Sequence, residues 1–250
     1  MQLQLRQVAL VAASLAPMEA ALAAVFDLLP CHRDPAVAQY GLENVLFPIG
    51  RQFLEIVAPT TAGTAAGRYL ERRGGDGGYM VITQCDDHDA CRARVATLGV
   101  RIAHEFKAPG FRNMQLHPRD TGGSFFEIDQ QLGDVEDWVP AGEHWRPAVR
   151  TTRVRAIVAA EIQADAPVAT AQRWAAIAAR PLSIGENSAT LALDNASLRF
   201  VPCTDGRPEG LAGLDLAASD APAVRAAAVA LGARVGPDGF ELAGMRWRLV

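Results

Sequence analysis

The fold is decided by residues 41–59, GLENVLFPIG followed by RQFLEIVAP. Two runs of apolar, strand-forming residues, 44–48 and 52–58, are separated by a turn at Gly50, and Pro59 closes the second run. Short apolar runs bounded by glycine and proline are typical of paired strands. This stretch therefore predicts two consecutive β-strands.

These strands complete a unit that occurs four times along the chain. A predicted strand at 5–12 and a predicted helix at 17–29 precede them. The later units have the same order of strand, helix and further strands: 79–85, 87–98, 100–106, 112–117 and 124–129; then 154–161, 168–179, 189–193 and 197–202; then 211–217, 221–231 and strands that run to 250. Four units of one order indicate a repeated α+β architecture.

The first 24 residues superficially resemble a secretory signal peptide, with Arg6, an apolar run at 8–16 and small residues after it. Pro17 and Glu19 interrupt the apolar region just before the expected cleavage zone. A proline is tolerated in the first turn of a helix because its missing N–H has no partner there. We therefore expect a strand and a helix of the folded protein here.

The composition is that of an ordinary globular protein of 250 residues, with one large domain or two small ones. Half of the residues are apolar, 21% are charged and the net charge is −4. The largest cationic cluster is Arg72-Arg73, so we expect neither nucleic acid nor a membrane surface as a partner. No apolar run approaches the roughly 18–20 residues of a membrane-spanning helix. Four cysteines do not form a disulfide framework, so we expect reduced thiols and a cytoplasmic location.

Two stretches resemble the vicinal oxygen chelate superfamily, which includes glyoxalase I, methylmalonyl-CoA epimerase, extradiol dioxygenases and bleomycin-resistance proteins. Residues 41–59 are similar to the G-x-x-N-x-L-x-x-x-G…Y-L-E-L-x-x-P pattern of glyoxalase-like domains. LHPRDTGG at 116–123, followed by FEI at 126–128, is similar to the H-P-K-D-T-G-G…E-L run of the epimerase branch. The resemblance is good over 5–131 and rests on the order of elements over 151–250.

The resemblance implies an α+β fold of tandem βαβββ modules, which pair into curved mixed sheets with a central cleft and with helices outside. Two paired modules form one cup that holds a ligand. We therefore expect a glyoxalase-like domain at 1–131, a linker at 132–150, and a second, diverged glyoxalase-like domain at 151–250. The first domain is expected to be the working one.

The resemblance also implies a divalent metal in the first domain, with ligands on the first and last strands of each module. These positions fall on Gln7, Glu55, Met80 and Glu127. Gln7, Glu55 and Glu127 offer three oxygen donors, which waters could complete to a weak octahedral site. A thioether favours soft ions, so Met80 departs from the family's pattern.

Alternation along the strands predicts where the two carboxylates point. Glu55 shares a face of its strand with Phe53, and Glu127 shares a face with Phe125 and Asp129. Glu55 and Glu127 are therefore expected to converge in the cleft. Without a metal, two facing carboxylates repel each other and one should have a raised pKa. Such a carboxylate can act as a general base next to a carbonyl group.

Other residues on or near these strands are expected to line the ligand cleft: Asn44, Phe53, Met80, His104, Arg112, Asn113 and Phe125. His117 is expected to support the turn that follows it. The segment from Cys85 to Cys91 has no second Cys/His pair nearby, so it predicts a strand end and a helix cap, not a zinc site. The first strands of the last two units contain no histidine, and Glu241 is the one late candidate, which argues against an extradiol dioxygenase.

Three hypotheses for the cleft stay open: metal-assisted catalysis, metal-free acid/base catalysis, and binding without catalysis. The first two imply a glyoxalase-like lyase, isomerase or epimerase that acts on a small oxygenated carbonyl compound. The alternative is a metal-free protein that binds or sequesters a small molecule, in the manner of bleomycin-resistance proteins. The sequence also leaves open a homodimer.

Overall fold

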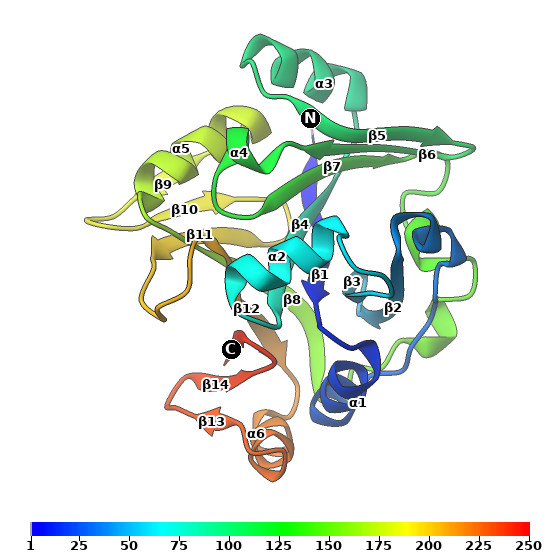
Figure 1. Ribbon diagram of the computed structural model, residues 1–250, viewed down its shortest axis with the longest axis vertical. Helices are drawn as coiled ribbons and strands as arrows, with labels where there is room; N and C mark the ends of the chain where they lie inside the picture. The colour runs from blue at the N-terminus through cyan, green and yellow to red at the C-terminus, as the bar shows by residue number, and fades with distance from the viewer. Residues whose placement is uncertain (1) are drawn as a thin grey trace. The chain divides into compact units, whose positions relative to one another are not determined.

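The computed structural model describes residues 2–250 and contains the repeated unit that the sequence predicts (Figure 1). The helices are α1 (Leu15–Phe26), α2 (Ala65–Arg73), α3 (His88–Thr97), α4 (Pro118–Thr121), α5 (Pro167–Ala178) and α6 (Ala221–Ala230), with 3-10 turns η1 (Pro35–Tyr40), η2 (Val139–Ala141) and η3 (Arg146–Ala148). The strands belong to four modules: β1 (Leu3–Val11), β2 (Leu42–Ile49) and β3 (Gln52–Pro59); β4 (Gly77–Cys85), β5 (Ile102–Ala108), β6 (Phe111–Leu116) and β7 (Phe125–Gln131); β8 (Val154–Ala164), β9 (Leu182–Ile184), β10 (Ala189–Ala192) and β11 (Ser197–Pro202); and β12 (Gly210–Ala218), β13 (Arg234–Val235), β14 (Gly239–Leu242) and β15 (Met245–Leu249).

The modules share one topology. In the second, third and fourth modules the first strand pairs in parallel with the last, and the other pairs are antiparallel. A parallel pair needs a long crossover, which the helix of each module supplies. Within the described residues the first module has one strand fewer. The predicted α+β class and its βαβββ repeat are confirmed.

The strands form two mixed sheets, and the helices pack against strands of their own modules. The first sheet has the order β2-β3-β1-β4-β7-β6-β5, and all of its strands precede the segment 132–150. The second has the order β13-β14-β15-β12-β8-β11-β10-β9, and all of its strands follow that segment. That residues 1–131 and residues 151–250 form two separate domains stays a prediction.

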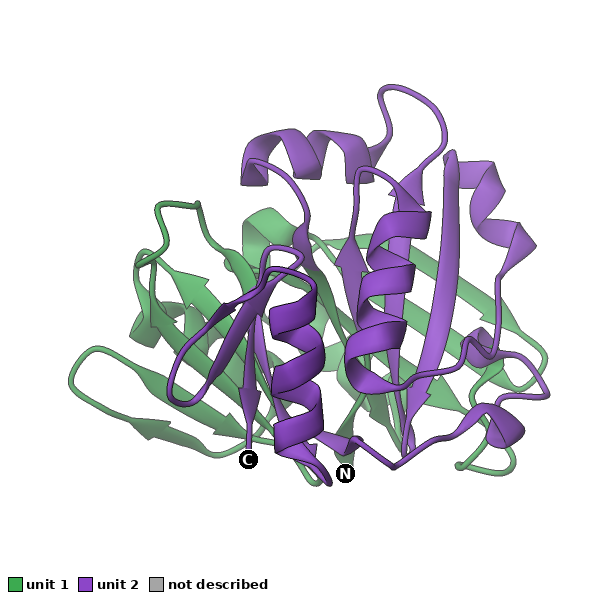
Figure 2. Ribbon diagram, turned by 90° about the horizontal axis from the view of Figure 1, so that it is seen from below, with its two compact units in different colours: residues 1–7, 79–139, 159–211 green, residues 8–78, 140–158, 212–250 purple. Residues whose placement is uncertain are grey.

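By compactness the chain divides into two units (Figure 2). Unit 1 comprises residues 1–7, 79–139 and 159–211, and unit 2 comprises residues 8–78, 140–158 and 212–250. Unit 1 therefore contains nearly all of the second and third modules, and unit 2 nearly all of the first and fourth. Strands β1 and β8 run from one unit into the other.

Aromatic stacking fixes helix α5 in the core of unit 1. Trp174 of α5 is fully buried, and its ring stacks on Phe126 of β7 at 4.2 Å with 6° between the planes. Phe200 of β11 meets the same indole edge-on at 5.5 Å. Pairs of this kind contribute about 0.5–1.5 kcal/mol beyond the buried area. The core of unit 1 therefore holds elements of its two modules together.

In unit 2, the hairpin of residues 41–59 forms as predicted. Strands β2 and β3 pair in antiparallel register, with Ile49 opposite Gln52 across the turn. Gly50 in that turn has φ +60°, and a Cβ there would collide with the backbone oxygen of Arg155. Only glycine satisfies both conditions without strain. The motif glycine is thus explained by the local backbone.

The N-terminal strand and helix are also confirmed. Strand β1 is buried along nearly all of its length, and Pro17 lies in the first turn of α1. At the other end of α1, the ring of Phe26 packs 4.8 Å from that of Trp247 on β15. No helix among residues 2–250 is long and apolar enough to cross a membrane.

Candidate functional site

One face of the sheet in unit 1 carries polar side chains from adjacent strands. Residues directly opposite each other on paired strands point to the same side, so register decides which side chains share this face. Glu127 of β7 lies opposite Ile82 of β4 and Gln115 of β6. Gln115 in turn lies opposite His104 of β5. Across this face the Glu127 carboxyl group therefore lies at the centre, and the Gln115 amide and the His104 imidazole follow it on one side.

A second carboxyl group lies on the same face. Asp129 follows Glu127 by two residues on β7 and lies opposite Gln84 of β4. Asp129 is fully buried, and Glu127 is 9% exposed. Asn113 Nδ2 donates to Asp129 Oδ1 at 3.1 Å, whereas no donor among the described residues reaches Asp129 Oδ2. The two carboxyl groups thus form a pair that water scarcely reaches.

The pKa of Asp129 is raised well above its ordinary value. Burial is the largest cause, and the charge of Glu127 and a hydrogen bond with Glu127 add to it. Hydrogen bonds from the Met114 backbone and the Asn113 side chain act in the opposite direction with smaller effect. Two carboxyl groups can bond to each other only if one holds a proton. The raised pKa of Asp129 therefore favours the proton on Asp129.

Met80, at one of the positions where the sequence resemblance implies a metal ligand, lies on β4 opposite Phe125 of β7. Gln115 Nε2 donates to the Met80 sulfur at 3.5 Å. The Phe125 ring lies 4.9 Å from the ring of Tyr79. A thioether is a weak acceptor, so the Gln115 amide can turn toward a stronger acceptor at small cost.

Gln7, the first predicted metal ligand, is engaged by a residue that the sequence assigns to the linker. Trp138 Nε1 donates to Gln7 Oε1 at 2.7 Å, and both side chains are buried. The Trp138 ring meets Phe111 of β6 edge-on at 5.3 Å and lies 5.4 Å from the Arg6 guanidinium carbon. The oxygen that would bind a metal therefore already accepts an indole hydrogen bond.

The donors that unit 1 presents do not fit a hard divalent cation. Gln7 Oε1 accepts from Trp138, Met80 offers a thioether that accepts from Gln115, and Glu127 is hydrogen-bonded to Asp129. No group of three or more His, Cys, Asp or Glu side chains in residues 2–250 is arranged to hold a metal ion. At this face unit 1 provides amides, carboxyl groups and aromatic rings.

The remaining predicted carboxylate, Glu55, lies in unit 2 on β3. Asn44 Nδ2 of β2 donates to Glu55 Oε1 at 2.7 Å, and Asn44 Oδ1 accepts from the Asp34 backbone N–H at 2.8 Å. Phe53, on the same face as Glu55, meets the ring of Trp145 edge-on at 5.1 Å. Asn44 therefore fixes Glu55 in place. Convergence of Glu55 with Glu127 stays a prediction.

Arg112 and His117 make contacts that support the local structure. Arg112 points to the opposite face of β6, where its Nη1 pairs with Asp89 Oδ2 of α3 at 2.8 Å. His117 caps α4 and accepts from the Arg119 backbone N–H at 3.2 Å, which is the turn-supporting role expected. The register brings four of the predicted cleft residues to the face of Glu127: Met80, His104, Asn113 and Phe125.

Sequence reasoning placed Asp129 on this face but did not name it as a site residue, and it missed Trp138 altogether. Asp129 carries a readable signal, because it follows Glu127 by two residues on a predicted strand. Trp138 carries a weaker one, as a large apolar residue in a linker rich in charged residues, Gly and Pro. Nothing in the sequence indicates its contact with Gln7.

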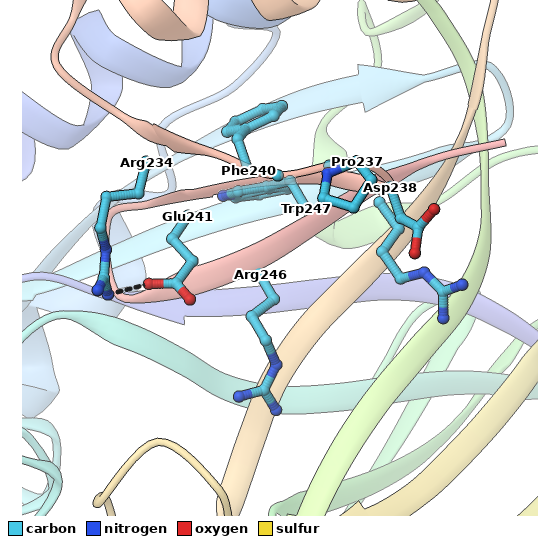
Figure 3. A pocket seen from close by; sticks show the side chains of 10 residues that line it. Arg234, Pro237, Asp238, Phe240, Glu241, Arg246 and Trp247 are labelled. Carbon is cyan, nitrogen blue, oxygen red and sulfur yellow. Dashed lines mark hydrogen bonds and ion pairs between the residues drawn. The ribbon is translucent and has the colours of Figure 1, made fainter.

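A separate, shallow hollow of about 230 Å³ lies on the β-hairpin of the fourth module in unit 2 (Figure 3). Arg234, Arg246 and Arg248 line it together with Asp238 and Glu241. Glu241, the late ligand candidate, forms an ion pair with Arg234. The hollow is smaller than the roughly 300–1,000 Å³ of ordinary small-molecule sites and contains none of the predicted cleft residues.

No protein-family model matches the sequence, and no curated protein matches it either. Among solved structures, a variant of 4-hydroxymandelate synthase from Streptomyces coelicolor is similar, with a TM-score of 0.71 and 15% identity over 92% of this chain and 75% of that one. A methylmalonyl-CoA epimerase from Streptomyces coelicolor reaches a TM-score of 0.47 and 19% identity over 52% of this chain and 98% of that one. The likeness to the synthase concerns the fold alone, and it agrees with the architecture of repeated βαβββ modules that the sequence resemblance implies.

Proposed function

We propose that the protein is a metal-independent lyase or isomerase of the glyoxalase-like class, with Glu127 as general base. Its substrate is a small oxygenated compound with a C–H bond next to a carbonyl group. The buried pair of Glu127 and Asp129 carries this proposal, because the raised pKa of Asp129 favours the proton there and makes Glu127 the better candidate for the base. We retain Glu55 as the second proposed catalytic carboxylate.

The proposed chemistry is a proton transfer. Glu127 takes the proton from the carbon next to the carbonyl group, the electron pair of that C–H bond forms a C=C bond, and the π pair of the carbonyl group moves to its oxygen. The reverse movement later returns the proton to carbon. The developing oxyanion needs a hydrogen-bond donor. Gln115 can supply this donor, because its amide N–H is bonded to the Met80 sulfur, which is a weak acceptor that a stronger one can replace.

Hydrogen–deuterium exchange tests the proposal directly. Small carbonyl compounds are incubated with the protein in D₂O, and loss of the C–H signal is followed by proton NMR. Glu127→Gln is expected to lower the exchange rate by about 100-fold or more, since general base catalysis contributes this much. Asp129→Asn is expected to retain most of the rate, because the amide keeps a donor toward Glu127. Chelator is expected to leave the wild-type rate unchanged.

Glu105→Gln is the matched control, because Glu105 lies on β5 of the same unit and pairs with Arg92 outside this face. Equal rates in wild type, Glu127→Gln and Glu105→Gln would refute the role of Glu127. Exchange that disappears with chelator would refute the metal-independent mechanism. Glu55→Gln decides separately whether Glu55 takes part.

The second candidate function is binding without turnover. Phe106 of β5 favours it, because this ring is 41% exposed beside Phe111 at 5.7 Å and His104 at 5.8 Å. An exposed aromatic side chain on a polar face of the sheet suits stoichiometric ligand binding. Saturable binding that Phe106→Ala weakens, with no exchange for any compound, would assign this function.

A further inference from the structure

Two cysteines of unit 1 lie side by side at the junction of β4 and α3. Cys85 ends β4, and Cys91 lies in the first turn of α3, where its backbone N–H bonds to the Asp87 oxygen at 3.2 Å. Asp87 caps the helix by accepting from the Ala90 backbone N–H at 2.9 Å. Both thiols are buried, but the residues between strand and helix, Asp86 and Asp87, are exposed.

The surroundings of the two sulfurs shift the pKa values of the two thiols in opposite directions. The two thiols are hydrogen-bonded to each other, and Arg94 Nη1 lies 4.0 Å from Cys91 Sγ. The hydrogen bond from Cys85 and the charge of Arg94 lower the pKa of Cys91 to about 7. The same hydrogen bond and burial raise the pKa of Cys85. Cys91 is thus the thiolate of the pair, and Cys85 holds the proton.

The other two cysteines of the chain have no such environment. Burial raises the pKa of Cys31 to about 12 and that of Cys203 to about 11. Neither forms a significant thiolate population near neutral pH. They therefore serve as internal controls in the same molecule.

We propose that Cys85 and Cys91 form a peroxide-reactive dithiol that closes reversibly to a disulfide. The Cys91 thiolate attacks one oxygen of hydrogen peroxide, the O–O bond breaks, and the departing hydroxide takes a proton to become water. Cys91 is then a sulfenic acid. The Cys85 sulfur gives up its proton and attacks the Cys91 sulfur, the S–O bond breaks, and a second water leaves. The two sulfurs lose two electrons in total, and the peroxide gains them.

Mass spectrometry of the full chain tests this site. The protein is treated with hydrogen peroxide under native conditions, then denatured, alkylated and cleaved with trypsin, which leaves Cys85 and Cys91 in one peptide, residues 74–92. This peptide is expected to lose the mass of two hydrogens and both alkylation sites. Its reaction is expected to be about tenfold or more faster than that of Cys31 or Cys203. A thiol reductant is expected to restore both alkylation sites.

Single substitutions separate the two sulfurs. Cys85→Ser is expected to stop at the sulfenic acid of Cys91, which dimedone traps, and Cys91→Ser is expected to leave residues 74–92 unmodified. Circular dichroism confirms that each variant is folded. If Cys85 and Cys91 in the wild type react no faster than Cys31 and Cys203, the pair is a packing feature and the proposal is wrong.

Discussion

Asp129→Asn is expected to make the protein more stable at neutral pH, although it alters a fully buried, hydrogen-bonded side chain. The asparagine keeps an oxygen for the Asn113 amide and presents a permanent donor to Glu127. The wild-type carboxyl group supplies that donor only while it holds a proton. The substitution thus removes the requirement for a proton and preserves the shape of the side chain.

The magnitude follows from proton linkage. The folded-state pKa of Asp129 is raised well above the ordinary value of 3.8. Between these two values the unfolded chain has lost its proton and the folded protein has not, so the wild-type free energy of unfolding falls as pH rises. The slope is about 1.4 kcal/mol per pH unit until the folded-state pKa is reached. The advantage of Asp129→Asn over wild type should grow with this slope and then level off.

Urea denaturation at a series of pH values between about 4.5 and about 8 measures this difference, in which the other titrating groups cancel. Asp120→Asn is the matched control, because the Arg101 guanidinium lowers the pKa of Asp120 at the surface and its difference from wild type should stay constant over this pH range. Its wild-type contribution is present above the ordinary carboxyl pKa and is lost on acidification. A difference between Asp129→Asn and wild type that does not change with pH would mean that Asp129 is ionised, which would refute the assignment of its proton.

Two other substitutions probe the contacts that hold the candidate residues. Trp138→Phe removes the donor to the buried oxygen of Gln7 and should lower the free energy of unfolding by about 1–3 kcal/mol, measured by urea denaturation. A double variant that also carries Gln7→Leu should recover part of this loss. If the effects of the two substitutions are fully additive, the contact is contradicted. Asn44→Ala removes the donor to Glu55 and should cost about 1.5–3 kcal/mol by the same measurement, whereas an unchanged midpoint would mean that Asn44 does not fix Glu55.

The local signals of the sequence predict most elements of the fold. The strands within residues 41–59 are set by the turn between them, and helix α1 ends where Asp27 adopts a left-handed conformation, so neighbouring residues suffice to predict both. Helix α2 was not predicted from the sequence, although Thr64 caps its start and Gly74 ends it in a left-handed conformation. Its nine residues form a short helix whose apolar residues are few, so periodicity alone gives a weak signal.

The candidate site is less predictable. A resemblance to a family shows which residue type stands at each ligand position, but it does not show which groups that side chain contacts. Gln7 illustrates this difference. Its type and its place on the first strand suit a metal ligand, but its oxygen bonds to Trp138, 131 positions further along the chain. A contact over that separation depends on how the linker packs against unit 1. No local pattern encodes it.

Glu127 shows the same limit with a larger consequence for mechanism. The sequence resemblance implies that Glu127 acts with Glu55, whereas within unit 1 Glu127 is hydrogen-bonded to Asp129 on its own strand. Alternation already puts Glu127 and Asp129 on one face, but the raised pKa of Asp129 comes from its burial and from the neighbouring Glu127, and it outweighs the opposing hydrogen bond from Asn113. With the proton there, Glu127 needs no second ionised carboxylate to act as a base. If Glu55→Gln leaves exchange unchanged while Glu127→Gln abolishes it, the pair within one strand is sufficient; if both abolish it, both carboxylates are required.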